Sequence, residues 1–205
     1  MTAGTLPKPR KTPRQARSGA TVEAILEAAA RILETEGLEG YTTNAVARRA
    51  GVSIGSLYQY FPNKDAIMAA LVLESTETVA ARMEQTLHDY RSRPVRDCID
   101  AIIDDAVCQQ LDRPVLARLI DIEEHRLARD PRLDAVRERI VSVVRTLLSR
   151  SGLELPFDLE TVTQDLFALS HGITDAAGLN GETDHAYLKA RIRHAVLSYL
   201  GVPAS

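Results

Sequence analysis

The chain has 205 residues, of which 45% are hydrophobic and 26% are charged, and its formal net charge is −3. These values are ordinary for a globular protein of one or two domains, and they exclude a fibrous or broadly disordered chain. No run reaches the roughly 18 apolar residues that would span a bilayer, and no apolar stretch follows the basic N-terminus as in a secretory signal. We therefore expect a soluble, cytoplasmic protein.

The charge is unevenly distributed. Residues 1–65 carry nine Lys and Arg against six Asp and Glu, whereas residues 66–205 carry sixteen against twenty-two. A basic front portion on an acidic body indicates a polyanion-binding module joined to a part with another role.

The two cysteines, Cys98 and Cys108, lie ten residues apart in a predicted helix, too far for a disulfide at about 1.5 Å of rise per residue. No His stands at zinc-site spacing from them, so we predict neither a metal site nor a cofactor.

The first segment, residues 1–17, contains five basic residues, three prolines and no acidic residue. This composition predicts a disordered arm. It has two interpretations that stay open: a solvated tail, or an arm that lies along phosphates or enters a minor groove beside a DNA-binding motif.

Residues 18–65 read as three short helices followed by the start of a fourth. The first has the apolar spacing of an amphipathic helix and ends near Gly37 and Gly40. Thr42 or Thr43 can cap the second, "TTNAVARRA", and "GVS" breaks it. Ser53 then caps the third helix, and Asn63 caps a fourth that begins at Lys64. The apolar residues of the first helix are Val22, Ile25, Leu26, Ala29, Ile32 and Leu33.

Residues 66–205 show no sustained alternation typical of strands. Prolines fall near helix boundaries, where a first turn tolerates them. The prediction is an all-α fold of about nine helices, with a three-helix front domain (18–65) and a helical body (66–205). The later helices are expected at about 64–90, 94–111, 114–128, 131–151, 158–179 and 184–200.

Two short helices joined by a tight turn at a glycine form a helix-turn-helix, whose second helix enters the major groove. Its leading residues must be small, as Gly55 and Ser56 are, and its N-terminus favours an anion. Gln59 can pair with adenine, while the hydroxyls of Tyr58 and Tyr60 can donate to phosphates. Leu57 and Phe61 already occupy the inward stripe, so packing does not account for both tyrosines.

At this point the sequence resembles the TetR family of one-component transcriptional regulators. The match spans about residues 20–72, includes the upstream "ILEAAARILETEG", and agrees at many spaced positions at once. The residues that carry it are Thr42-Thr43, Val46-Ala47, Ala50-Gly51-Val52-Ser53, Gly55, Leu57-Tyr58, Tyr60-Phe61 and Asn63-Lys64.

The resemblance implies DNA contacts from the start of the second helix, from the third and from the start of the fourth. Lys64 is also a candidate phosphate contact on grounds other than the resemblance. A cation at a helix start opposes the helix dipole, so helix stability alone does not explain this lysine. Tyr60 stands where many members carry His. Arg48 and Arg49 are either solvated charges or DNA contacts. The implied set is Thr42, Thr43, Asn44, Ser53, Ile54, Gly55, Ser56, Tyr58, Gln59, Tyr60 and Lys64.

The helix near 158–179 is apolar on two faces, which indicates burial on two sides. One side can meet a second copy of the chain in a four-helix isologous bundle, as the resemblance implies; the alternative is that both sides belong to the chain's own core. The predicted interface residues are Leu159, Val162, Thr163, Leu166, Phe167, Thr174, Gly178, Leu188, Ile192, Val196 and Tyr199.

No effector is assigned. Cys108, Gln110, Tyr90, Asp121, His125 and His171 are possible cavity residues, but surface or satisfied polar roles are the stronger interpretation of each. The resemblance implies that the body, residues 66–205, is a helical effector-binding and dimerisation domain. It carries no family-wide motif from which a ligand could be inferred.

The expected function is a ligand-responsive repressor that binds a palindromic operator in double-stranded DNA as a homodimer and is released by a small-molecule effector. The alternative is a ligand-independent architectural or interaction protein of the same fold. An enzyme is not expected, because the sequence lacks a nucleophile–base constellation, a Gly-rich phosphate loop and a metal-site motif.

Overall fold

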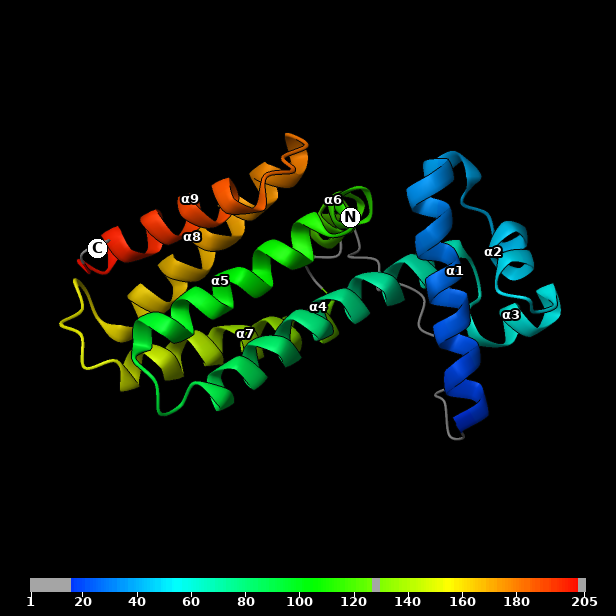
Figure 1. Cartoon of the computed structure of the whole chain (residues 1–205). Coiled ribbons are helices and arrows are strands. Elements are labelled where there is room, and N and C mark those ends of the chain that lie inside the picture. Colours follow the sequence, from blue (N-terminus) through cyan, green and yellow to red (C-terminus); the bar gives the residue numbers. More distant parts are fainter. Residues whose placement is uncertain (1–15, 127–129, 203–205) are drawn as a thin grey trace, which may run out of the picture. The chain divides into compact units, whose positions relative to one another are not determined.

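The computed structural model describes residues 16–126 and 130–202. This part of the chain contains nine α-helices and no strand (Figure 1), so the predicted all-α fold is confirmed. None of the described helices is long and apolar enough to cross a membrane. The helices are α1 (Ala16–Gly40), α2 (Thr43–Arg49), α3 (Ile54–Tyr60), α4 (Lys64–Asp89), α5 (Val95–Leu111), α6 (Pro114–Arg126), α7 (Pro131–Arg150), α8 (Leu159–Leu179) and α9 (His185–Tyr199).

The chain divides into two compact units. The first, the head, falls within Met1–Ser75 and Ile122–Asp130, and the second, the body, within Thr76–Asp121 and Pro131–Ser205. The domain boundary predicted from the sequence lies between residues 65 and 66, whereas the division between these two units falls after Ser75, inside α4. The reason is burial: Ile67 and Val72, in the first turns of α4, are fully covered. Both α4 and α6 therefore contribute residues to each unit.

The head is built around the apolar face of α1. Ile25, Ala29 and Leu33 are fully buried, in agreement with the helical spacing of the sequence. Gly37 has φ +64°, a left-handed conformation that glycine adopts without strain, and it interrupts the helical backbone before Gly40 ends the element.

The core of the body is formed by residues of α5, α7, α8 and α9. Helices α8 and α9 lie side by side with α5 next to them (Figure 1). Polar contacts support this packing at its edges: Arg193 donates to Asp100 at 2.7 Å, and Lys189 pairs with Asp104 at 2.5 Å. Each of these pairs joins α9 to α5.

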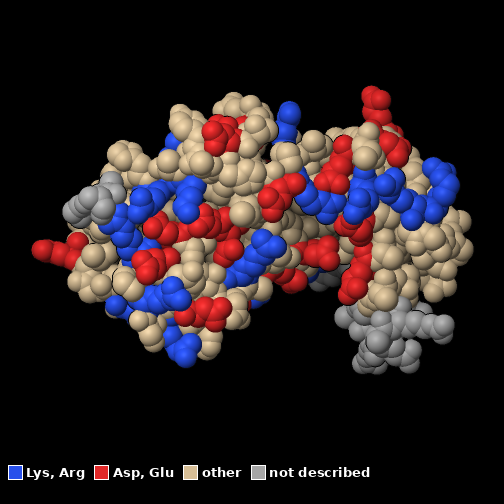
Figure 2. All heavy atoms as spheres, viewed as in Figure 1, with Lys and Arg blue, Asp and Glu red and all other residues tan. Residues whose placement is uncertain are grey.

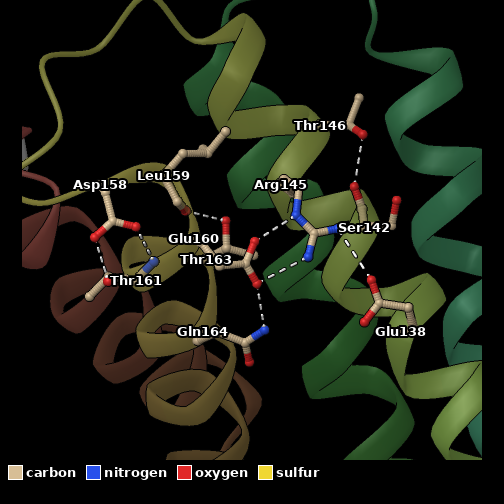
Figure 3. Close-up of polar contacts among 10 residues, drawn as sticks. All are labelled: Glu138, Ser142, Arg145, Thr146, Asp158, Leu159, Glu160, Thr161, Thr163 and Gln164. Atoms are coloured by element: carbon tan, nitrogen blue, oxygen red, sulfur yellow. Dashed lines mark hydrogen bonds and ion pairs between the residues drawn. The ribbon is translucent and has the colours of Figure 1, made fainter.

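The start of α8 is fixed by a polar cluster (Figure 3). Asp158 accepts from the Thr161 hydroxyl at 2.6 Å and caps the helix by accepting from the Thr161 amide at 3.0 Å. The hydroxyl bond first, and then the amide bond, hold the pKa of Asp158 below its usual value. Arg145 of α7 donates to both oxygens of Glu160, at 2.9 and 3.2 Å, and to Glu138 at 3.3 Å. The guanidinium therefore ties α7 to the first turn of α8.

Most of the predicted dimer residues lie in the chain's own core. Their side chains are covered by neighbours of the same chain, as the intrachain alternative requires. Leu159 and Tyr199 pack partly buried against that core, while Phe167 and Thr174 are half-buried. The fully covered members are Val162, Thr163, Leu166, Gly178, Leu188, Ile192 and Val196.

Leu188 tests this placement, because its side chain is 0% exposed in the single chain. Leu188→Ala is expected to lower the free energy of unfolding by about 2–5 kcal/mol, through lost apolar burial and the cavity left behind. Urea unfolding at several protein concentrations measures it. A loss of equal size at every concentration indicates a core residue, whereas a loss confined to high concentration would contradict the assignment. Val115→Ala, at a 51% exposed position of α6, is the control.

Candidate nucleic-acid interface

The turn between α2 and α3 is short and sterically specified. After Ala50 caps α2, Gly51 adopts φ +70°, which favours glycine, and the Val52 amide donates to the Ala47 carbonyl at 3.0 Å. A tight turn of this kind between two seven-residue helices is the geometry of a helix-turn-helix.

Each of the helices α2, α3 and α4 begins with a side-chain cap. The Thr42 hydroxyl accepts from the Ala45 amide at 3.2 Å. The Ser53 hydroxyl accepts from the Ser56 amide at 3.0 Å, and Asn63 Oδ1 accepts from the Ala66 amide at 2.9 Å. Because a cap satisfies one of the first amides, the helix begins at a defined residue. The sequence predicted the Ser53 and Asn63 caps and left the choice between Thr42 and Thr43 open; Thr42 is the cap.

The inward and outward sides of α3 are separated as the spacing predicted. Leu57 is 0% exposed and the adjoining Phe61 is 1% exposed. On the outward side, Ile54 and Tyr58 are exposed although they are large and apolar or aromatic. Their exposure leaves this side of α3 accessible to a partner.

The predicted DNA-binding residues are spread over the starts of α2, α3 and α4, and none is buried. Thr43, Ser56 and Tyr60 are half-buried. The exposed members are Thr42, Asn44, Ser53, Ile54, Gly55, Tyr58, Gln59 and Lys64. Their assignment to DNA contacts stays a prediction, and eight of the eleven have the exposure that such contacts require.

A side-chain contact joins α2 to α3 on this surface. The Thr43 and Tyr58 hydroxyl oxygens are 3.2 Å apart and share a hydrogen bond. The residues are 15 positions apart in sequence. The bond holds the Tyr58 ring at the surface next to the start of α2, so that two residues expected at phosphates are already positioned together.

Gly55 has no role in the packing of its own chain. A Cβ at this position would have Ser53 Oγ as its nearest neighbour, 3.9 Å away, and the backbone is not left-handed. Alanine would fit and would favour the helix by up to about 1 kcal/mol. Packing within the chain therefore does not explain this glycine, and a role for Gly55 in close approach to a DNA groove stays a prediction.

Basic side chains accompany this surface. Arg48 and Arg49 are exposed in the last turn of α2, where cations also complement the helix dipole. In the view of Figure 2, Lys and Arg atoms gather over the part of the head that α2 forms, whereas basic and acidic atoms are interspersed on the body. Exposed cations beside helix starts provide the positive potential that binds a polyanion.

The possible effector residues in the body do not form one cluster among the described residues. Gln110 is buried and its amide donates to Asp121 at 3.0 Å. A Cβ on Gly178 would lie 2.2 Å from Gln110 Nε2, so any larger residue here would displace the Gln110 amide. His171 instead stacks on Phe167 and lies 3.5 Å from Asp175.

The remaining possible effector residues are Cys108, Tyr90 and His125. Cys108 and Tyr90 are half-buried, and the side chain of His125 lies outside the described residues. No group of three or more potential metal ligands occurs in 16–126 and 130–202.

The capped tri-helical head, the glycine turn and the exposed outward side of α3 define a helix-turn-helix DNA-binding protein. The N-terminal model described as "Bacterial regulatory proteins, tetR family" matches residues 25–71. The model described as "Tetracyclin repressor-like, C-terminal domain" matches residues 94–200. The chain therefore belongs to the tetR family of DNA-binding transcriptional regulators. Because these regulators are not enzymes, the prediction that the chain has no enzymatic activity is confirmed.

Relatives and solved structures agree with this family. The chain is 29% identical over 160 residues to the nucleoid occlusion factor SlmA of Vibrio atlanticus, covering 73% of this chain and 80% of that protein. It is 26% identical over 159 residues to the transcriptional regulator YobS of Bacillus subtilis, covering 77% and 79%. A TetR-family regulator from Streptomyces coelicolor superposes with a TM-score of 0.70 at 26% identity, over 90% of this chain and 98% of that one.

Sequence reasoning missed two features of the head. The Thr43–Tyr58 hydrogen bond, and a bond from Tyr41 to the main chain of Lys64 at 2.9 Å, each join residues distant in sequence. Neither follows from helical periodicity or capping rules, which relate residues at most four positions apart. The chain has only six tyrosines, and this scarcity was the one signal in the sequence that could have drawn attention to Tyr41.

Gly55→Ala should separate stability from binding. We expect the free energy of unfolding to rise by about 0.5–1 kcal/mol, because alanine favours the helix and meets no neighbour. DNA affinity should fall at least about tenfold, since the added methyl blocks close approach to the groove. Thermal unfolding and fluorescence anisotropy on duplex DNA measure the two effects. A gain in stability with unchanged DNA affinity would contradict the placement of Gly55 at the interface.

Proposed function

We propose that this protein is a ligand-responsive repressor that binds a palindromic operator as a homodimer and is released by a small-molecule effector. The observation that carries the proposal is the outward side of α3, with exposed Ile54, Gly55, Tyr58 and Gln59, which the head leaves uncovered. The output is repression because a protein that occupies a promoter blocks the polymerase sterically. Since its target is chromosomal DNA, the protein acts in the cytoplasm.

In this proposal the residues of the head divide by role. Thr42, Thr43, Tyr58 and Lys64 bind phosphates and set the position on the duplex, while base edges are read from α3. The backbone at Gly55 approaches the groove, and Gln59 is suited to adenine. Further base or phosphate contacts come from Asn44, Ser53, Ile54, Ser56 and Tyr60.

The dimer is proposed through the exposed sides of α8 and α9, opposite the buried stripes. Gly172, within α8, is exposed and a Cβ there would meet nothing within 4 Å, so its own chain gives no reason for glycine. Ala168 and Ala190 are also exposed and small, and Leu179 and Tyr187 are 55% and 57% exposed. Small residues allow helices to approach closely, and exposed apolar residues favour association. Two such helices from each chain form an isologous four-helix interface.

A two-fold dimer determines the form of the operator. Its two α3 helices enter successive major grooves about 34–36 Å apart, so the DNA site has two half-sites related by inversion.

Effector response is proposed to pass through helices shared by the two units. Helix α4 is continuous from Lys64 in the head to Asp89 in the body, and α6 likewise contributes to both units. A ligand that shifts these helices in the body changes the position of Lys64. Coupling of about 1–3 kcal/mol, typical of allostery, would change DNA affinity about 5- to 150-fold.

A ligand-independent DNA-binding protein of the same fold is the second candidate. Two observations favour it: the relative named a nucleoid occlusion factor, and the direct packing of Gln110, Asp121 and Gly178 inside the body. The mark of this candidate is operator binding that no small molecule alters. A compound screen that uses the operator complex as its probe separates the two.

Operator binding is the first test. The duplex is taken from immediately upstream of the protein's own gene and compared with a scrambled duplex by fluorescence anisotropy. We expect preferential binding of two chains per site that weakens steeply with salt. Tyr58→Phe and Lys64→Ala should each reduce affinity about 5- to 30-fold, because each removes a phosphate contact.

Leu38→Ala is the matched control, since Leu38 is 54% exposed in the head and lies outside the proposed interface. Equal affinity for the scrambled duplex, together with indifference to the Tyr58 and Lys64 changes, would refute operator recognition.

The dimer interface is tested by charge insertion. Ala168→Arg is expected to convert the dimer to a monomer at micromolar concentration, because an arginine at a close helix contact introduces both a clash and an unpaired buried charge. Ala135→Arg makes the same change on the exposed side of α7 and should leave the dimer intact. Sedimentation equilibrium measures both. Dimers of equal strength in the two variants would place the interface elsewhere.

A further inference from the structure

The start of α4 is held by an anchor outside its own helix. Tyr41, in the connection between α1 and α2, is 3% exposed, and its hydroxyl donates to the Lys64 carbonyl at 2.9 Å. The two residues are 23 positions apart in sequence. Lys64 is the first residue of α4, so this single bond connects the α1–α2 corner with the beginning of the next long helix.

The bond is not needed to satisfy Lys64. A carbonyl in the first turn of an α-helix already accepts from the amide four residues later. The buried phenol hydroxyl is the group that needs a partner, and it finds one at the main chain rather than at a side chain. The consequence is that the backbone of Lys64 cannot shift without breaking a buried hydrogen bond.

The hydroxyl is a permanent donor. Burial, with smaller contributions from the negative charges of Asp65 and Glu123, raises the pKa of Tyr41 well above its usual value. A tyrosine with a raised pKa stays protonated wherever the protein is folded near neutral pH, so the bond to Lys64 does not depend on pH in that range.

Tyr41 stands directly before the cap of α2. Thr42 accepts from the Ala45 amide, and Thr43 shares a hydrogen bond with Tyr58. The starts of α2 and α4 are thus connected through one residue, and they are two places where the proposed function puts phosphate contacts. Phosphates on a duplex have fixed spacing, so two contact points must be held at a matching separation to bind together.

We propose that Tyr41 is a positioning residue for DNA binding: its buried hydroxyl fixes the start of α4 relative to the start of α2, so that Thr42, Thr43 and Lys64 reach phosphates together. This inference rests on the proposed function, because it takes the Lys64 ammonium to be a phosphate contact. Tyr41 itself does not touch DNA.

The readout is the salt dependence of binding to the upstream duplex. Each lysine–phosphate contact contributes about 0.9 to the slope of log affinity against log salt. Lys64→Ala should lower the slope by about 1 per chain. Tyr41→Phe keeps the buried ring and removes only the hydroxyl. We expect it to lower the slope by a similar amount and to weaken binding about 5- to 10-fold at low salt. The double variant should be no weaker than Lys64→Ala alone.

Thr35→Val is the matched control. It removes another hydroxyl-to-carbonyl hydrogen bond of the head, from Thr35 to the Arg31 carbonyl at 2.8 Å, on an exposed part of α1. Its slope should equal that of the wild type. A loss of stability without a change of slope in Tyr41→Phe would show that the hydroxyl is only structural, and would overturn the inference. Losses that add in the double variant would overturn it as well.

Asn63→Ala provides a test in which Tyr41 is unchanged. It removes the other anchor of the same turn, the cap on the Ala66 amide, at an exposed residue. With the Tyr41 bond intact, the slope should stay at the wild-type value. A slope as low as that of Lys64→Ala would assign the positioning to the cap instead.

The remaining outcomes separate this inference from the function on which it rests. An unchanged slope in Lys64→Ala refutes the phosphate contact at Lys64, and the role of Tyr41 with it. Equal binding of upstream and scrambled duplexes by the wild type refutes operator recognition itself.

Discussion

The burial of Leu57 and Phe61 is the constraint on which the DNA-binding surface depends. With these side chains 0% and 1% exposed, α3 can be oriented in only one way on the head. The positions off this inward stripe then lie at or near the surface: Ile54 and Tyr58 are exposed, while Ser56 and Tyr60 are half-buried. The caps at Ser53 and Asn63 add the second half of the constraint, since they fix where the outward surface begins and ends.

Two exposed helical glycines, Gly55 and Gly172, are not explained by packing within the chain. Gly55 and Gly172 both lie in helices and are exposed, and neither has a neighbour that a methyl group would disturb. Glycine is a poor choice for helix stability, so each position favours a function that the single chain does not display. The partner proposed for Gly55 is a DNA groove, and the partner proposed for Gly172 is a helix of a second chain. Gly178 is the instructive contrast, because the Gln110 side chain of the same chain fills the space where its Cβ would be.

The head and the body are separate compact units, but α4 and α6 contribute residues to both. The division inside α4, rather than at its first residue, means that the first turns of this helix belong to the packing of the head. Lys64 is consequently fixed by head residues, through Tyr41 and the Asn63 cap, while the remainder of α4 packs in the body. A helix anchored in this way transmits a displacement along its length instead of absorbing it in a loop, which suits the proposed effector response.

Much of the architecture follows from the sequence, because helices are specified by local rules. Apolar spacing, capping residues and prolines relate positions within one or two turns, and the expected ranges of α4 to α9 agree closely with those observed, the last two residues of the expected α6 range lying outside the described residues. The inward positions of Leu57 and Phe61 follow from the same spacing. The exposure of the predicted DNA-contacting residues also agrees, since a residue off the apolar stripe of a short surface helix has nowhere else to point.

Tertiary structure alone decided which of the two apolar faces of α8 the chain covers by itself. Val162, Thr163 and Leu166 met the sequence criterion for an interface equally well, yet they are buried against α5, α7 and α9 of the same chain. The apolar periodicity of a helix predicts that one of its faces is buried, but it does not predict which helix, of the same or of a second chain, covers that face. The same limit applies to Tyr41, whose hydroxyl finds Lys64 across 23 residues. The sequence by itself determined the helices, the caps at Ser53 and Asn63, and the family. Pairing between residues far apart in the chain is a property of packing, and only the folded chain supplies it.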